Sequence, residues 1–259
     1  MHSFIMNKAQ IALRKAAELS ARYEMRRNSD LWAALEAYLK ATKSTGCGLS
    51  DYKALYNHIR KYRPQEVLEC GTGVSTLVIA HALKENGKET GNFGRVTSME
   101  EYSEWLDMSE ILLPDSYHDT VEFHQSDTIE DSFSIFRGVR YKDIPERNYD
   151  FVFVDGPKYV SPVDGTPTFD FDFIHVLRSS NAKVRGIVDK RVSTSFVLQQ
   201  ILGKKKVRYC PIVHLAFIGA CTASDLGNLD QDLSSANFQK SLRGLGFASL
   251  SMSPVKLVQ

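Results

Sequence analysis

The chain has 259 residues, of which 43% are hydrophobic and 24% are charged, which is enough for one full-size α/β domain with a small appendage. Its formal net charge of +1 gives no overall attraction to nucleic acid or to an anionic membrane. No segment approaches the roughly 20 apolar residues that span a bilayer, and the N-terminus lacks the features of a secretory signal. The four cysteines form no C-x-x-C pair, so a metal–thiolate site has no support. We therefore expect a cytoplasmic protein with reduced thiols.

Residues 1–62 are predicted to form helices. Apolar residues that recur at spacings of four and three define one face of the first helix: Ile5, Ala9, Ala12, Ala16 and Leu19. The segment 42–48 is a flexible break, Ser50 is placed to cap a third helix, and Pro64 ends that helix. We expect this extension, residues 1–62, to cover an acceptor site or to form a homo-oligomer contact.

Residues 63–259 are predicted to form an α/β domain. The expected strands are 66–70, 95–99, 121–125, 149–154, 184–188, 207–210 and 213–219. The expected helices between them are 75–84, 104–113, 129–136, 169–178 and 193–202. This alternation predicts a mainly parallel sheet with helices on both faces, and the last two strands form an antiparallel pair at its edge. Polar loops are expected at 85–94 and 161–168.

A glycine turn follows the first strand of this domain. Gly71 and Gly73 allow the backbone to approach a ligand closely, and Glu69 before them can attract the ammonium of a methionine moiety. A bulky residue at Gly71 is expected to block that ligand and leave the fold intact. A dinucleotide site is the alternative, but its fingerprint requires a third glycine where Thr76 stands, and Glu69 would repel a pyrophosphate.

The ends of the next two strands also carry candidate ligands. Glu100 is placed to accept hydrogen bonds from both hydroxyls of a ribose, and Glu101 is its neighbouring alternative. Ser126 and Asp127 can bond to the edge of an adenine. Asp127 is equally suited to cap the helix predicted after it, and the two roles are compatible.

A nearly all-apolar run ends at Asp155, which Gly156-Pro157 then turns away from the strand. A carboxylate at the carboxyl end of a buried strand rarely serves packing. Asp155 is therefore the leading candidate for contact with the reacting methyl group or the acceptor. Lys158 is a further acceptor contact, with an exposed loop residue as the equally weighted alternative.

These motifs, taken in order, resemble class I S-adenosylmethionine (AdoMet)-dependent methyltransferases of the Rossmann-like type over roughly residues 66–219. The resemblance implies a seven-stranded sheet with an antiparallel edge hairpin and AdoMet lying across the strand tips. It assigns cofactor contacts to Glu69, Gly71, Gly73, Ser75, Glu100, Ser126, Asp127 and Asp155. Ser75 replaces the third glycine of the usual turn, which is typical of a smaller subgroup, many of whose members act on small molecules or sugars.

One subclass, the catechol-type O-methyltransferases, holds a divalent cation with an Asp after the fourth strand and an Asp-Asn pair after the fifth. The corresponding residues here are Asp155, Asp189 and Lys190. A lysine ammonium repels a cation, so magnesium is less favoured than a site without metal. In its place, Lys190 or Lys158 would neutralise an acidic acceptor or replace the charge of the metal.

We therefore expect a methyltransferase that acts at oxygen on a small-molecule acceptor, with Asp155, Lys158 and Asp189 at the acceptor side. One alternative is a catalytically inactive, methyltransferase-like module that binds a nucleoside or a partner. A nicotinamide-dependent oxidoreductase is the other. The basic run 203–208 is better explained as a solvated turn than as a nucleic-acid contact, because no aromatic residues are interleaved in it.

Overall fold

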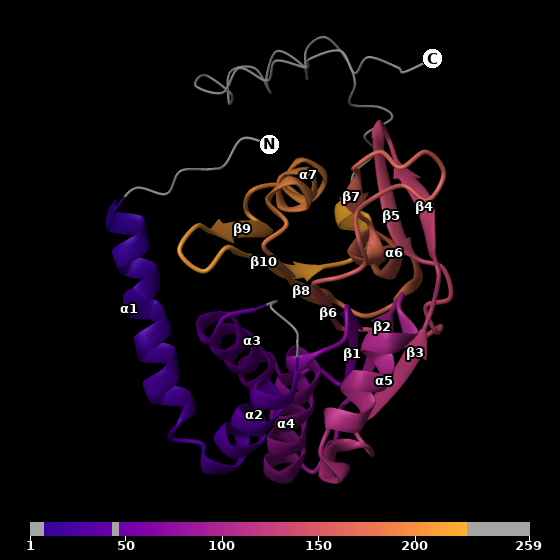
Figure 1. Ribbon diagram of the computed structural model, residues 1–259. Helices are drawn as coiled ribbons and strands as arrows, with labels where there is room; N and C mark the ends of the chain where they lie inside the picture. The colour runs from indigo at the N-terminus through magenta and orange to yellow at the C-terminus, as the bar shows by residue number, and fades with distance from the viewer. Residues whose placement is uncertain (1–7, 43–46, 227–259) are drawn as a thin grey trace. The chain divides into compact units, whose positions relative to one another are not determined.

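The computed structural model describes residues 8–42 and 47–226, and these residues belong to one compact unit. Its centre is a seven-stranded sheet in the order β3-β2-β1-β6-β8-β10-β9 (Figure 1). The strands of this sheet are β1 (Glu66–Cys70), β2 (Arg95–Glu100), β3 (Val121–Gln125), β6 (Phe151–Val154), β8 (Val184–Asp189), β9 (Val207–Cys210) and β10 (Leu215–Cys221). The first five in sheet order run parallel, whereas β10 is antiparallel to both β8 and β9. The predicted sheet and its antiparallel edge hairpin are confirmed.

Seven α-helices surround this sheet among the described residues. They are α1 (Lys8–Met25), α2 (Ser29–Ala41), α3 (Leu49–Tyr62), α4 (Val74–Thr90), α5 (Ser103–Leu112), α6 (Asp172–Ser179) and α7 (Val192–Leu202). In Figure 1, α2, α3 and α4 lie together on one side of the sheet, and α6 and α7 lie on the other. None of the described helices is long and apolar enough to cross a membrane.

The N-terminal helices share their core with the sheet. Leu35 of α2 and Ile59 of α3 have no exposed surface and belong to the same buried cluster as Val67 of β1 and Phe151 of β6. Since neighbouring strand residues point to opposite faces, Leu68 is buried on the side that α6 and α7 cover. Helices α2 and α3 are therefore part of the folded unit that carries the sheet.

Three predicted elements differ from the structure. The helix expected at 129–136 is wrong, because β4 (Thr128–Phe133) and β5 (Phe136–Tyr141) form an antiparallel hairpin there, joined in a second sheet by β7 (Phe169–Asp170). The hydrophobic residues at 129 and 133 fit either period, and Ser134, with a φ of 55°, makes the tight turn. The loop expected at 85–94 is mostly helical, since α4 continues to Thr90, and Gly48 rather than Ser50 is the N-cap of α3.

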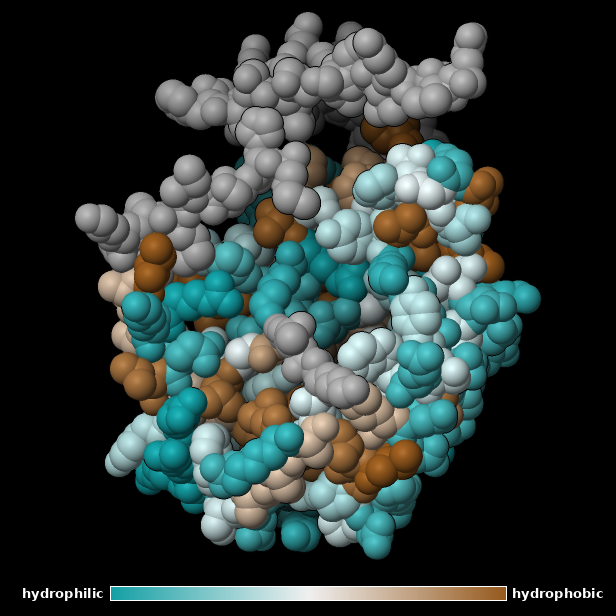
Figure 2. All heavy atoms as spheres, viewed as in Figure 1, coloured by the Kyte–Doolittle hydropathy of each residue, from teal (hydrophilic) through white to brown (hydrophobic). Residues whose placement is uncertain are grey.

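The described part of the apolar face predicted for the first helix does not pack on the protein, and Ile5 and the side chain of Ala9 lie outside what the structure describes. Ala12, Ala16 and Leu19 are exposed, whereas Ala21 and Met25 are buried. Glu18 lies on the inward side instead, where it accepts hydrogen bonds from the backbone N–H groups of Leu49 and Ser50 at 3.0 and 3.2 Å. Because the free N–H groups at the start of a helix need acceptors, this pairing fixes the side of α1 that faces α3. Figure 2 shows apolar residues mixed with hydrophilic ones along the edge that α1 occupies.

Candidate active site at the strand tips

The turn between β1 and α4 is built on two glycines with different roles. A Cβ on Gly71, which has a φ of 92°, would lie 2.8 Å from the backbone nitrogen of Gly156. Gly71 is therefore required by the packing of the β1 tip against the β6 tip, and the expectation that a bulky substitution there spares the fold is wrong. A Cβ on Gly73 would meet no atom within 4 Å, so this glycine borders open space.

Glu69, at the end of β1, is a buried carboxylate that is only half satisfied. Its Oε2 accepts hydrogen bonds from the hydroxyls of Thr76 and Ser98, each at 2.6 Å, while the buried Oε1 has no hydrogen-bond partner. Burial raises the pKa of Glu69 from 4.5 to about 7, and the hydroxyl groups around the carboxylate, among them those of Ser98 and Thr76, oppose that shift. An unpaired buried acceptor of this kind is costly unless a cationic or hydrogen-donating ligand meets it.

Glu100 ends β2 and fixes the chain after it. One oxygen, Oε1, accepts hydrogen bonds from the backbone N–H groups of Glu101 and Tyr102 at 2.9 and 3.1 Å. Burial raises the pKa of Glu100, and the backbone N–H of Thr72 opposes the shift, which places the carboxylate against the glycine turn. Glu69 and Glu100 therefore flank the turn from neighbouring strands.

Ser126 and Asp127 follow β3, but they are placed differently from one another. The buried Ser126 hydroxyl donates to the carbonyl of Asp127 at 2.8 Å and accepts from the backbone N–H of Asp143 at 2.9 Å, so it holds the protein's own loop. The Asp127 side chain is exposed. Asp127 does not cap a helix, since β4 begins at the next residue.

Asp155 directly follows β6, Asp189 ends the neighbouring strand β8, and the thiol of Cys47 links them. The thiol donates to Oδ2 of Asp189 at 3.3 Å and lies 3.6 Å from Oδ2 of Asp155. Burial raises the pKa of each carboxyl to about 6, and the charge of Asp155 adds to the shift of Asp189. The second oxygen of Asp189, Oδ1, is buried without a hydrogen-bond partner. We call Asp155 and Asp189 the acid pair.

Helix α3 adds a third carboxylate to this cluster. Asp51 accepts a hydrogen bond from the backbone N–H of Gly48 at 2.8 Å, which holds it in the first turn of α3. The ammonium of Lys190 lies 3.8 Å from Oδ2 of Asp51 and 3.8 Å from Oδ2 of Asp189. A positive charge therefore stands between the carboxylates of α3 and β8.

Two other basic residues organise the loop after β6. The guanidinium of Arg191 donates to the backbone carbonyls of Asp155 and Pro157 at 2.6 and 2.8 Å and forms an ion pair with the buried Asp170. Arg191 thus holds the turn that presents Asp155. The ammonium of Lys158 contacts the hydroxyl of Tyr102 at 2.8 Å, on an exposed surface, rather than either member of the acid pair.

The structure thus brings together two of the three predicted acceptor-side residues, Asp155 and Asp189, and places the third elsewhere. Cys47, Asp51 and Arg191 were not predicted. Nothing in the local sequence marks Cys47 or Asp51, because only the packing of α3 against the sheet brings them to β8. Only Arg191 could have been suspected from the sequence, because it lies two residues after Asp189.

Residues 68–179 match a protein family described as a methyltransferase domain. The match begins in β1 and extends through the glycine turn, Glu100 and Asp155 to α6, within a sheet that has five parallel strands and an antiparallel edge pair. Over these residues the chain carries a methyltransferase domain. The predicted fold and the predicted similarity to methyltransferases are therefore confirmed, and the roles of the strand-tip residues stay predictions. No curated protein matches the chain.

Solved structures with a related fold include several methyltransferases. The S-adenosylhomocysteine-bound methyltransferase PaMTH1 of Podospora anserina is 14% identical, with 78% of this chain and 77% of that chain covered and a TM-score of 0.47. A SAM-dependent methyltransferase of Aquifex aeolicus is 14% identical, with 60% and 81% covered and a TM-score of 0.37. A protein of Nostoc punctiforme, described as a putative O-methyltransferase, is 12% identical, with 94% of this chain and 69% of that chain covered and a TM-score of 0.30. At these levels of similarity, the family match and the sheet carry the assignment.

Proposed function

We propose that this methyltransferase transfers the methyl group of AdoMet to an oxygen of a small molecule, with the acid pair Asp155 and Asp189 receiving the proton of the acceptor. The observation that carries the proposal is the meeting of the buried Asp189 and the partly buried Asp155 at the tips of β8 and β6, beside the glycine turn. An oxygen acceptor needs a proton removed as the methyl group arrives, and a carboxylate within hydrogen-bond reach can receive it.

Three features of the described residues fit AdoMet. The unpartnered Oε1 of Glu69 offers a buried negative charge to the ammonium of the methionine moiety. The open space beside Gly73 is a cradle that any side chain would fill. Glu100 has its Oε1 held by the backbone N–H groups of Glu101 and Tyr102, and we assign its carboxylate to the hydroxyls of the ribose. We further propose that the exposed Asp127 contacts the adenine edge, and that Gly71, Ser75 and Ser126 act by shaping the loops.

Bound AdoMet supplies a methyl group on a sulfonium, which is already activated for displacement. The work left to the protein is then to orient the acceptor and to hold its proton. Burial raises the pKa of both acids, and their mutual repulsion raises that of Asp189 further, so the pair takes up a proton more readily than ordinary carboxylates do. Arg191 keeps Asp155 in place through its carbonyl.

A divalent cation does not fit this centre as well as the lysine does. Cys47, Asp51 and Asp189 each have a ligand atom within 4.8 Å of the others, which is a spacing a metal ion could bridge. The Lys190 ammonium, however, already lies 3.8 Å from both carboxylates and would repel a second cation. We therefore propose that Lys190, rather than a metal ion, compensates the negative charge of these carboxylates.

The proposal is tested by incubating the protein with AdoMet that carries a labelled methyl group and a panel of small hydroxyl, amine and thiol compounds. We expect label in an O-methyl product, and we expect Asp189→Asn to abolish it while the affinity for S-adenosylhomocysteine stays within about twofold of wild type. Label only in N- or S-methyl products would refute the oxygen acceptor. Binding of S-adenosylhomocysteine without transfer to any compound would favour the inactive, nucleoside-binding alternative.

A further inference from the structure

A short segment after β6 crosses the tip of β1. Gly156 lies directly on Gly71, since a Cβ on Gly156 would be 2.7 Å from the Gly71 Cα, and its backbone N–H donates to the carbonyl of Cys70. Because β1 lies between β2 and β6 in the sheet, the residues that follow reach the β2 side. We call residues 156–158 the strap.

The outer end of the strap is latched to the turn after β2. The backbone N–H of Lys158 donates to Oε1 of Glu101 at 3.1 Å. The Lys158 ammonium contacts the hydroxyl of Tyr102 at 2.8 Å and lies 4.8 Å from the centre of the Tyr102 ring. Lys158 and Tyr102 are both exposed. Since polar and cation–π contacts at exposed positions are weak, this latch opens easily.

The inner end of the strap is held by buried groups. The side chain of Arg191 is 11% exposed, and it donates to the backbone carbonyls of Asp155 and Pro157 at 2.6 and 2.8 Å. It also forms an ion pair with the buried Asp170. Charge-assisted hydrogen bonds are strong, and they are stronger still in a buried environment. The strap is therefore fixed firmly beside β6 and loosely beside β2.

The proposed AdoMet contacts next to the strap are closed to solvent. Glu69, the proposed partner of the methionine ammonium, is 0% exposed, and its unpartnered Oε1 is buried. The ammonium of a ligand therefore reaches this oxygen only after a segment around the β1 tip has moved. Oε1 of Glu100, the proposed ribose contact, accepts the backbone N–H groups of Glu101 and Tyr102 at 2.9 and 3.1 Å. The latch thus borders the proposed AdoMet site on the ribose side.

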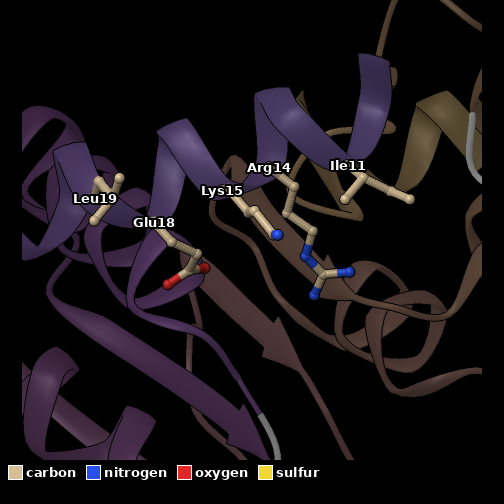
Figure 3. A pocket seen from close by; sticks show the side chains of 5 residues that line it. All are labelled: Ile11, Arg14, Lys15, Glu18 and Leu19. Atoms are coloured by element: carbon tan, nitrogen blue, oxygen red, sulfur yellow. The ribbon is translucent and has the colours of Figure 1, made fainter. Parts of the chain in front are cut away.

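Other segments around the site are held by buried or half-buried groups. The hydroxyl of the buried Thr76 accepts the backbone N–H of Gly73, which closes the glycine turn. The first turn of α3 is held by Glu18, which extends from α1 in Figure 3 and accepts the N–H groups of Leu49 and Ser50 at 3.0 and 3.2 Å. Compared with these two segments, the outer end of the strap moves most easily.

We propose that the strap is a gate for AdoMet: its Lys158 end releases Glu101 and Tyr102 to let the cofactor enter or leave, and then closes again. This rests on the proposed placement of AdoMet at the β1 tip. Because the same latch is closed before and after binding, weakening it speeds entry and exit alike and leaves the dissociation constant nearly unchanged. Loss of a direct contact with AdoMet would instead speed exit alone and weaken binding.

The test is stopped-flow binding of S-adenosylhomocysteine to the full chain, followed by tryptophan fluorescence. Trp105 is a suitable reporter, because its backbone N–H donates to the carbonyl of Tyr102 at 3.1 Å. K158M keeps the apolar stem of the side chain and removes the ammonium, whereas Y102F removes the hydroxyl alone. K183M is the matched control, since Lys183 is exposed and precedes β8 at the opposite edge of the sheet. Hydrogen–deuterium exchange of the amides of residues 158–160 is measured on each protein without ligand.

We expect K158M to raise the association and dissociation rate constants about fivefold each, with the dissociation constant within about twofold of wild type. Y102F should raise both rate constants about two- to threefold, and K183M should match wild type. The amides of residues 158–160 should exchange faster in K158M than in wild type.

Unchanged rate constants in K158M would overturn the gate. So would faster dissociation alone with a weaker dissociation constant, because Lys158 would then be a direct contact of the cofactor. If S-adenosylhomocysteine does not bind wild type, the proposed function falls, and amide exchange still tests the latch: faster exchange in K158M supports it, and unchanged exchange overturns it.

Discussion

Replacing Glu69 with glutamine should make the ligand-free protein more stable at neutral pH and the cofactor complex weaker. The pKa of Glu69 is raised from 4.5 to about 7 by burial, so the folded state favours the protonated carboxyl. Its contribution to stability is present below pH 4.5 and is lost as the pH rises through about 7. The loss corresponds to about 3 kcal/mol, most of it between about pH 5 and about pH 8.

Glutamine keeps the shape of the side chain and removes this dependence. Its amide oxygen can still accept the hydrogen bonds that Thr76 and Ser98 donate. Urea denaturation at about pH 5 and about pH 8 should therefore give a difference in unfolding free energy that is about 2–3 kcal/mol smaller for Glu69→Gln than for wild type. Glu104→Gln, at an exposed position in α5, is the control and should match wild type.

The same substitution should act on cofactor affinity in the opposite direction. In wild type, the affinity for S-adenosylhomocysteine should fall about tenfold from about pH 8 to about pH 6, because Glu69 takes up a proton and loses its attraction for the ligand's ammonium. In Glu69→Gln, the affinity at about pH 8 should be about 10- to 100-fold weaker and nearly independent of pH over this range. A variant that is less stable at both pH values, with unchanged affinity, would refute the role assigned to Glu69.

Further predictions concern the ribose contact, the base, the lysine and the shared core. Glu100→Gln should weaken binding of both S-adenosylhomocysteine and 5′-methylthioadenosine about tenfold in calorimetry, whereas a change at Glu69 should spare 5′-methylthioadenosine, which lacks the ammonium. Transfer to the acceptor should slow as the pH falls below about 6, where Asp189 takes up a proton, and a flat profile would contradict the base. Lys190→Asn should create magnesium binding, since asparagine tolerates the φ of 50° at this position and supplies a ligand oxygen, and magnesium binding to wild type would contradict the assignment. Leu35→Ala should lower the free energy of unfolding by about 2–5 kcal/mol in one transition, and a separate early transition would show that α2 folds apart from the sheet.

The central sheet could be predicted from the sequence because its strands are continuous apolar runs that lie between helices. Val67 and Phe151 belong to such runs, and both are buried in the structure. The helix predicted at 129–136 was wrong because the apolar residues of this segment fit helical and strand periods alike. The hairpin depends instead on pairing with β7, which lies far along the chain. The buried face predicted for α1 was wrong for a related reason, because a polar contact made by Glu18, rather than apolar spacing, orients that helix.

The site was predictable where it follows directly from strand ends. Glu69, Glu100, Asp155 and Asp189 each lie within one residue of the end of a strand, and parallel strands bring their carboxyl ends to one edge. Asp51 is brought to the same edge by helix packing, which no local pattern encodes. The contacts of Lys158 depend on where Tyr102 lies, and this too is tertiary information.

The most direct test of the account is calorimetric titration of the full chain with AdoMet and S-adenosylhomocysteine, with and without magnesium, on wild type and Glu69→Gln. We expect one site with a micromolar dissociation constant in wild type, no effect of magnesium, and clear weakening in the variant at about pH 8. Absence of binding to wild type, or equal binding to both proteins, would contradict the placement of the cofactor at the β1 tip.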